Sequence, residues 1–136
     1  MRFDLPAPDD TTEPFWQACR ERTLLIKRCD DCGFAFYYPR PFCKRCWSAK
    51  VRWVRASGLG TLYTFSVVHH NDLPPFPERV PYVAAMVQLD EGPRVMTNIV
   101  DCEFDALRCD IDVAVDFIEI SDDPHFMIPV FRPALR

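Results

Sequence analysis

The sequence contains no apolar run that approaches the roughly 18–20 residues needed to span a bilayer. Its first residues, Met-Arg-Phe-Asp-Leu-Pro, also lack the basic and then apolar layout of a secretory signal peptide. No Gly-x-Ser-x-Gly motif is present, so the usual signature of a serine nucleophile on a strand-to-helix turn is missing. We therefore expect a protein that does not cross a membrane and does not use this serine chemistry.

The seven cysteines do not form a disulfide framework. Four of them occur in two close pairs, which leaves Cys19, Cys102 and Cys109 as an odd remainder without regular spacing. Unpaired cysteines of this kind are typical of free thiols in a reducing compartment, and we expect the protein in the cytoplasm. The length of 136 residues, with 49% hydrophobic and 26% charged residues, fits one soluble domain or two small ones that share a surface.

The two cysteine pairs form a metal-binding pattern. Cys29 and Cys32 make one Cys-x-x-Cys knuckle, and Cys43 and Cys46 make a second one after ten intervening residues. Four cysteines at this spacing predict a tetrahedral, all-thiolate zinc site, although ligand type alone also permits iron. Because the protein fills all four positions, the metal has no open site for a substrate, and we expect it to be structural.

The charge is distributed unevenly along the chain. Although the formal net charge is −4, the segment from Arg20 to Arg55 contains ten basic residues and only three acidic ones. A basic segment on an acidic body predicts a polyanionic ligand or an acidic partner surface there, and solvated side chains on an exposed module are the alternative.

The first half of the chain predicts an arm, a helix and a small ribbon. Residues 1–11 are rich in proline and aspartate and are expected to be an extended arm, and Thr12 is expected to cap a helix that runs to about Arg22. The ribbon strands are expected at 24–26, 34–38 and 51–55. Residues 12–56 would thus form a helix plus zinc ribbon too small to fold without metal.

The second half, residues 57–136, has a sequence pattern typical of a small β-barrel. Strands are expected at 61–68, 82–89, 94–100, 113–120 and 128–132, with one helical turn in 101–107. Prolines in 128–132 predict an edge position for the last strand. A long proline-rich loop, 69–81, follows the first strand. We expect a mainly β protein with a five-stranded OB-fold barrel; a thin sandwich is the alternative.

The order of these parts resembles a known family. The motifs that carry the resemblance are Phe15–Trp16, Cys29–Gly33, Pro39–Arg40, Cys43–Cys46, Gly58–Thr61, Val67–His69, Pro81–Val83, Leu89–Gly92 and Pro129–Phe131. From residue 12 onward, this ordered set resembles the zinc-ribbon/OB-fold acyl-CoA-associated family, catalogued as domain of unknown function 35. The chain departs from the family pattern at Lys44, at Trp47, and at Cys109 and Asp110, where the family often has proline, glycine and a turn glycine.

The resemblance implies a non-catalytic accessory subunit. Members of the family bind thiolase-like enzymes, including aldolases that shorten steroid side chains as CoA thioesters, or MaoC-type enoyl-CoA hydratases, and help to form an acyl-CoA site. In that role, Arg40, Lys44 and Arg45 would contact CoA phosphates or the partner, since arginine binds phosphate in a bidentate fashion.

The residues also permit two other functions. His69, His70 and Asp72 could supply acid–base catalysis, but no nucleophile accompanies them, so we predict no catalytic residue and a partner-facing loop instead. Binding of single-stranded nucleic acid is the strongest rival, because OB barrels bind single strands and the ribbon mixes aromatic with basic residues. The acidic barrel and the sequence pI of about 5.3 argue against it.

Overall fold

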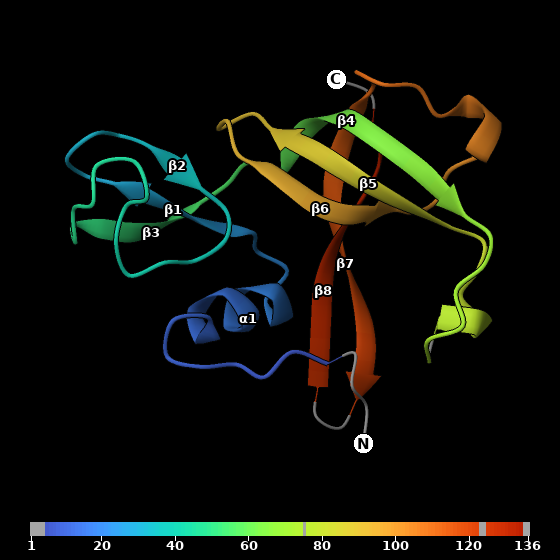
Figure 1. The fold of residues 1–136 in the computed structure, drawn as a ribbon, viewed down its shortest axis with the longest axis horizontal. Helices are drawn as coiled ribbons and strands as arrows, with labels where there is room; N and C mark the ends of the chain where they lie inside the picture. Colours follow the sequence, from blue (N-terminus) through green and yellow to red (C-terminus); the bar gives the residue numbers. More distant parts are fainter. Residues whose placement is uncertain (1–4, 75, 123–124, 135–136) are drawn as a thin grey trace.

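The computed structural model describes residues 5–74, 76–122 and 125–134, and the start of the predicted arm, residues 1–4, lies outside them. A three-stranded ribbon sheet stands at one side of a closed five-stranded barrel, with one helix beneath both (Figure 1). This arrangement confirms the prediction of a mainly β protein with an OB-fold barrel. In the described part of the chain, no helix combines the length and the apolar character needed to cross a membrane.

The single α-helix, α1 (Glu13–Arg20), buries Phe15, Ala18 and Cys19. The prediction that it extends to Arg22 was wrong, because Arg22 adopts a φ of 59° and its backbone N–H donates to the Cys19 carbonyl. Thr12 occupies the N-cap position, as predicted, but its side chain makes no capping hydrogen bond to the helix.

The ribbon sheet has the strand order β2-β1-β3, with β1 (Leu25–Cys29), β2 (Ala35–Phe36) and β3 (Val51–Arg55). The strand expected over 34–38 is only two residues long. Beyond it the chain turns toward the barrel, where the Tyr38 hydroxyl accepts a hydrogen bond from the backbone N–H of Met96 at 3.1 Å.

The barrel consists of β4 (Leu59–Val68), β5 (Tyr82–Leu89), β6 (Arg94–Ile99), β7 (Asp112–Asp122) and β8 (His125–Pro133), in the order β4-β5-β6-β8-β7. Side chains of β5 alternate between buried and half-buried, as expected for a strand with one face on the core. The expected edge position of the last strand was wrong. β8 pairs along its length with β7 and meets β6 at Ile99 and Phe131, which closes the barrel.

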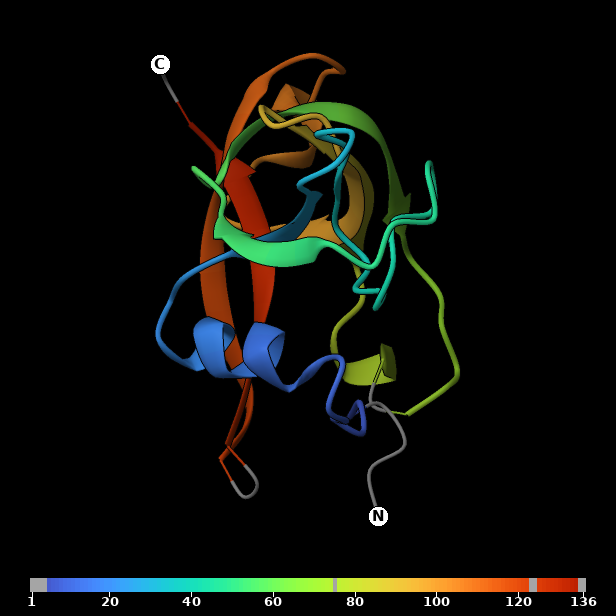
Figure 2. The ribbon, with the colours of Figure 1, turned by 90° about the vertical axis from the view of Figure 1, so that its left-hand side faces the viewer.

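One core joins the helix, the ribbon and the barrel. Phe15 and Cys19 of α1 and Ile26 of β1 belong to the same buried cluster as Leu62 and Val87 of the barrel. Trp16 packs edge-on against Phe126 of β8 at 5.2 Å between ring centroids, and α1 lies beside this strand in Figure 2. The ribbon therefore stands in a fixed position on the barrel.

The connections carry two short 3-10 helices. η1 (Phe76–Glu78) lies in the proline-rich loop, and η2 (Phe104–Ala106) falls within the segment where one helical turn was expected. The β5–β6 hairpin turns at Asp90–Pro93, with the Gly92 N–H donating to the Leu89 carbonyl. Asp110 takes the left-handed φ of 72° that the family pattern assigns to glycine.

Candidate metal centre and the adjoining basic cavity

Two equivalent turns position the cysteines. In the first knuckle, the Gly33 N–H donates to the Cys29 carbonyl, and in the second the Trp47 N–H donates to the Cys43 carbonyl. The residue after the second cysteine of each knuckle has a positive φ, 77° for Gly33 and 66° for Trp47. Glycine adopts this conformation readily, whereas Trp47 adopts it although a side chain at positive φ is strained.

The four sulfur atoms converge on one point. The Sγ atoms of Cys29, Cys32, Cys43 and Cys46 lie within 4.8 Å of one another. Across the two knuckles, Cys29 and Cys46 approach to 3.6 Å, and Cys32 and Cys43 to 3.7 Å. Zn–S bonds of about 2.3 Å in a tetrahedron require sulfur separations of about 3.8 Å, so this donor set fits a structural metal ion.

The electrostatics of the cluster also favour a cation. Burial opposes ionisation of Cys43, but the backbone N–H groups of Cys46 and Arg45 and the neighbouring thiols lower its pKa to about 7. The backbone at Ser48 favours ionised Cys46, yet burial and the other three cysteines outweigh it and raise the pKa of Cys46 to about 12. Four thiolates this close repel one another, and a bound divalent cation removes that repulsion.

Acidic residues tie the first knuckle to the rest of the ribbon. Asp30 accepts a hydrogen bond from the Arg52 guanidinium at 2.7 Å, and Asp31 accepts one from the Ser48 hydroxyl. The backbone N–H of Lys50 donates to the same hydroxyl at 3.0 Å. These links join both knuckles, so the cluster is held from several directions.

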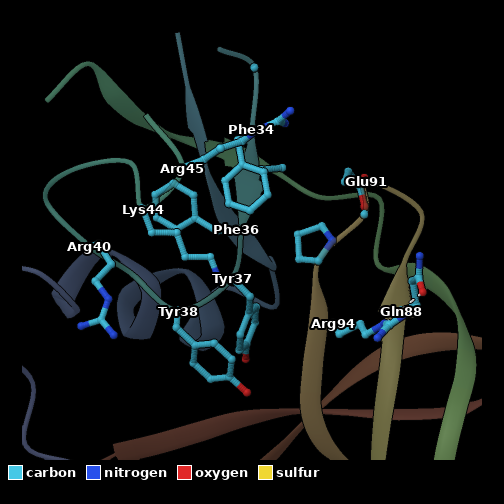
Figure 3. A pocket seen from close by; sticks show the side chains of 14 residues that line it. Phe34, Phe36, Tyr37, Tyr38, Arg40, Lys44, Arg45, Gln88, Glu91 and Arg94 are labelled. Atoms are coloured by element: carbon cyan, nitrogen blue, oxygen red, sulfur yellow. Dashed lines mark hydrogen bonds between the residues drawn. The ribbon is translucent and has the colours of Figure 1, made fainter. Parts of the chain in front are cut away.

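A cavity of about 670 Å³ lies between the ribbon and the β5–β6 hairpin. The predicted contact residues Arg40, Lys44 and Arg45 all line it, and Arg94 of the hairpin joins them (Figure 3). Lys44 and Arg45 also lie over the Phe34 ring, at 5.7 and 5.8 Å from its centroid. The structure thus brings four cationic side chains to one concave surface.

Sequence reasoning missed Arg94. It lies far from the other basic residues in the chain and lines the cavity from the β5–β6 hairpin. Its side chain extends toward Gln88 (Figure 3). Its guanidinium stacks on Tyr63 at 3.9 Å and donates to the Gln88 side chain at 3.3 Å, which holds it in place. No local pattern around residue 94 signals this proximity.

Two contacts fix the walls of the cavity. The Tyr38 hydroxyl accepts a hydrogen bond from the Met96 N–H of β6. The Glu91 carboxylate accepts one from the backbone N–H of Ser57 at 2.8 Å, which joins the hairpin turn to the linker after β3. Burial raises the pKa of Tyr37 well above its usual range. Tyr37 therefore stays neutral as a packed part of the wall.

The histidine pair lies elsewhere. His69, His70 and Asp72 are exposed on the loop after β4, and none of them lines the basic cavity. His70 Nε2 lies 3.2 Å from an Asp72 carboxylate oxygen, with both side chains more than four-fifths exposed. A polar contact this exposed to water stabilises little.

Most ribbon aromatic residues pack within the module. Phe34 and Phe36 stack at 6.1 Å, Phe36 is buried, and Trp53 lies under the Lys27 ammonium at 4.6 Å. Trp47 is exposed, but its ring stacks on Phe42. These rings form the core and cover of the ribbon, an arrangement that differs from the row of free stacking faces that single strands require.

Models of known protein families match both halves of the chain. The profile of the rubredoxin-like zinc ribbon domain of ChsH2 matches residues 16–52, and that of the C-terminal OB-fold domain of ChsH2 matches residues 53–117. A "DUF35 domain-containing scaffold protein" of Methanocaldococcus jannaschii is 35% identical over 110 residues, 79% of this chain and 77% of that protein.

Two further matches are to a hydratase subunit and to an aldolase structure. A "probable enoyl-CoA hydratase alpha subunit" of Thermomonospora curvata is 39% identical over 89% of this chain, which spans only 37% of that protein's length. The solved structure "Ltp2-ChsH2(DUF35) aldolase" matches with a TM-score of 0.84 and 35% identity, covering 96% of this chain and all of the other. The comparisons do not favour the nucleic-acid alternative. The chain belongs to the DUF35 family of zinc-ribbon and OB-fold proteins.

Proposed function

We propose that this chain is a non-catalytic accessory subunit that binds a thiolase-like or enoyl-CoA-hydratase-like enzyme and helps to form its acyl-CoA site. The observation that carries the proposal is the match over nearly the whole chain to the DUF35 chain of an aldolase structure. The described cysteines form no disulfide, which supports a reducing, cytoplasmic location.

The metal in this proposal is one Zn²⁺ ion, with iron the less favoured alternative. The ligands would be Cys29, Cys32, Cys43 and Cys46, a closed set in which the metal only stabilises structure. Metal analysis of the purified protein, together with its visible absorption spectrum, tests this assignment. One zinc per chain and no thiolate-to-iron absorption are expected, and a coloured iron protein would contradict it.

We further propose that Arg40, Lys44 and Arg45, joined by Arg94, bind the phosphates of CoA or the partner's surface. Their convergence at one cavity supports this role, because several cations together bind a polyanion better than any one of them. Substituting Arg40, Lys44 and Arg45 by alanine should weaken binding of acyl-CoA to the assembled complex by about tenfold or more, as measured by calorimetry. Unchanged affinity would remove these residues from the proposal.

The exposed loop 69–81, with His69, His70 and Asp72, is proposed as a second partner-facing surface. Hydrogen exchange of this loop should slow when the complex forms. Exchange that is the same in the free chain and the complex would remove the loop from the interface.

The central experiment is a nuclease-treated affinity pull-down from the native host, with the bound proteins identified by mass spectrometry. A stoichiometric thiolase-like or hydratase-like protein is expected. Recovery of no such protein, or turnover of a panel of acyl-CoA esters by the isolated chain, would contradict the accessory role.

A further inference from the structure

Strand β6 has an open edge over residues 94–97. Its partner on one side is β5, with Met86 opposite Met96, but on the other side it meets β8 only at Ile99 and Phe131. Among the described residues, no strand pairs with the first half of β6 on this side. The pairing of Ile99 with Phe131 closes the barrel, but the adjoining edge of β6 over residues 94–97 has no strand partner.

Pro129 gives the physical reason. β6 and β8 run parallel, and the register that joins Ile99 to Phe131 places Pro129 beside Thr97, whose hydroxyl donates to the Pro129 carbonyl at 3.3 Å. In a parallel ladder, the backbone N–H of residue 129 would donate to the Met96 carbonyl, and proline has no N–H. The ladder stops there.

The backbone groups of Arg94 and Met96 point out of this edge. The Met96 N–H donates to the Tyr38 hydroxyl of the ribbon, which shows that it faces away from β5. Because hydrogen-bonding directions alternate along an antiparallel pair, the N–H and carbonyl of Arg94 face the same way. Met96 is 70% exposed and Tyr38 is 52% exposed, so one tyrosine side chain only partly covers the edge.

The surroundings favour an acidic, extended occupant. Arg94 and Pro93 line the basic cavity, so the open edge continues into a surface that carries Arg40, Lys44 and Arg45. The one acidic residue of that lining, Glu91, is already bonded to the Ser57 backbone. A strand added to β6 would project alternate side chains toward these cations.

We propose that the open edge of β6, residues 94–97, binds an extended acidic segment of the partner subunit by β-strand addition. The inference rests on the proposed accessory function. The incoming backbone carbonyl replaces the Tyr38 hydroxyl as acceptor for the Met96 N–H, and an incoming N–H supplies the donor that Pro129 cannot give to the Met96 carbonyl. Charge complementarity with the cavity then selects acidic segments.

The test uses the full chain labelled with ¹⁵N and a blocked peptide of alternating valine and glutamate, about ten residues long, as the probe. The Met96 amide should show the largest shift. Amide exchange of Arg94 and Met96 should slow by about tenfold or more, because these two amides gain strand partners. Amide exchange of Val95 and Thr97, which already face β5, should change little.

Matched peptides and variants test the charge and the place of binding. A peptide of alternating valine and lysine should bind about tenfold more weakly than the glutamate peptide. Met96→Glu should weaken binding of the glutamate peptide by a similar factor, whereas Met96→Lys should not weaken it. Phe104→Glu, on the exposed 3-10 helix η2, changes charge at another surface and should leave binding unchanged. Thermal unfolding checks that each variant folds.

The inference is overturned if the glutamate peptide does not bind saturably, if the lysine peptide binds equally well, or if Met96→Glu binds like the natural chain. Shifts confined to the basic side chains and reproduced by inorganic phosphate would also overturn it, since they would reveal an anion site without strand addition. This experiment needs no partner enzyme. Its failure therefore leaves the accessory role intact, and failure of the pull-down leaves the peptide result intact.

Discussion

At the residue scale, the residue that follows each knuckle, Gly33 or Trp47, has a positive φ. Gly33 has open space around a hypothetical Cβ atom, so a substitution there acts through the backbone alone. Gly33→Ala should therefore lower the free energy of unfolding of the metal-loaded ribbon by about 1 kcal/mol. Denaturant unfolding followed by tryptophan fluorescence measures the change, and an unchanged midpoint would contradict the assigned strain.

The cysteine ligands allow a sharper test. Cys43→Ser leaves a site with three thiolates, and we expect it to lose metal and unfold the ribbon, because metal binding supplies on the order of 10 kcal/mol in comparable modules. Partner binding should be lost while the barrel stays partly folded. Metal content and amide exchange of β5 measure the two effects.

Cys109→Ser is the matched control for that change. Cys109 is a free, exposed cysteine outside the cluster. This variant should keep its metal, its ribbon and its partner. If Cys43→Ser behaves in the same way, the four-cysteine site is not the metal centre.

At the element scale, the N-terminus of α1 depends on a residue before the expected cap. The Asp9 carboxylate accepts hydrogen bonds from the backbone N–H groups of Thr11 and Thr12, each at 2.9 Å. Asp9→Ala should therefore lower the free energy of unfolding by about 1 kcal/mol, the usual effect of removing such a capping group. Asp10→Ala removes an equal charge next to it and serves as the control; equal losses in both variants would assign the effect to charge.

The bounds of helices and strands show which features the local sequence pattern predicts. The strand predicted over 82–89 has the same bounds as β5 in the structure, where one face of the strand lies on the core. The end of α1 was not predicted, since Arg22 has no sequence signature for a positive φ. We retain as a proposal the division into an arm at 1–11, a helix plus ribbon at 12–56 and a barrel at 57–136.

At the scale of the whole molecule, the metal should stabilise the barrel as well as the ribbon. Phe15, Leu24 and Ile26 share a core with Leu62 of the barrel, so an unfolded ribbon exposes part of the barrel's apolar surface. Treatment with a strong chelator should expose Trp53 and lower the Tm of the remaining barrel by several degrees, on the order of 5 °C. Fluorescence and calorimetry measure this, and restored metal should reverse it. An unchanged barrel Tm would mean that the two modules are thermodynamically independent.

The sequence by itself determined which four cysteines converge, the presence of the ribbon and the succession of the barrel strands along the chain. These features depend on spacing and periodicity within short segments, where backbone geometry dictates which side chains lie together. Only the tertiary structure decided that Arg94 joins Arg40, Lys44 and Arg45 at one cavity, and that Pro129 leaves half of β6 open beside them. Both facts depend on register and docking between segments far apart in the chain, and no local pattern encodes which distant backbone group a residue will meet.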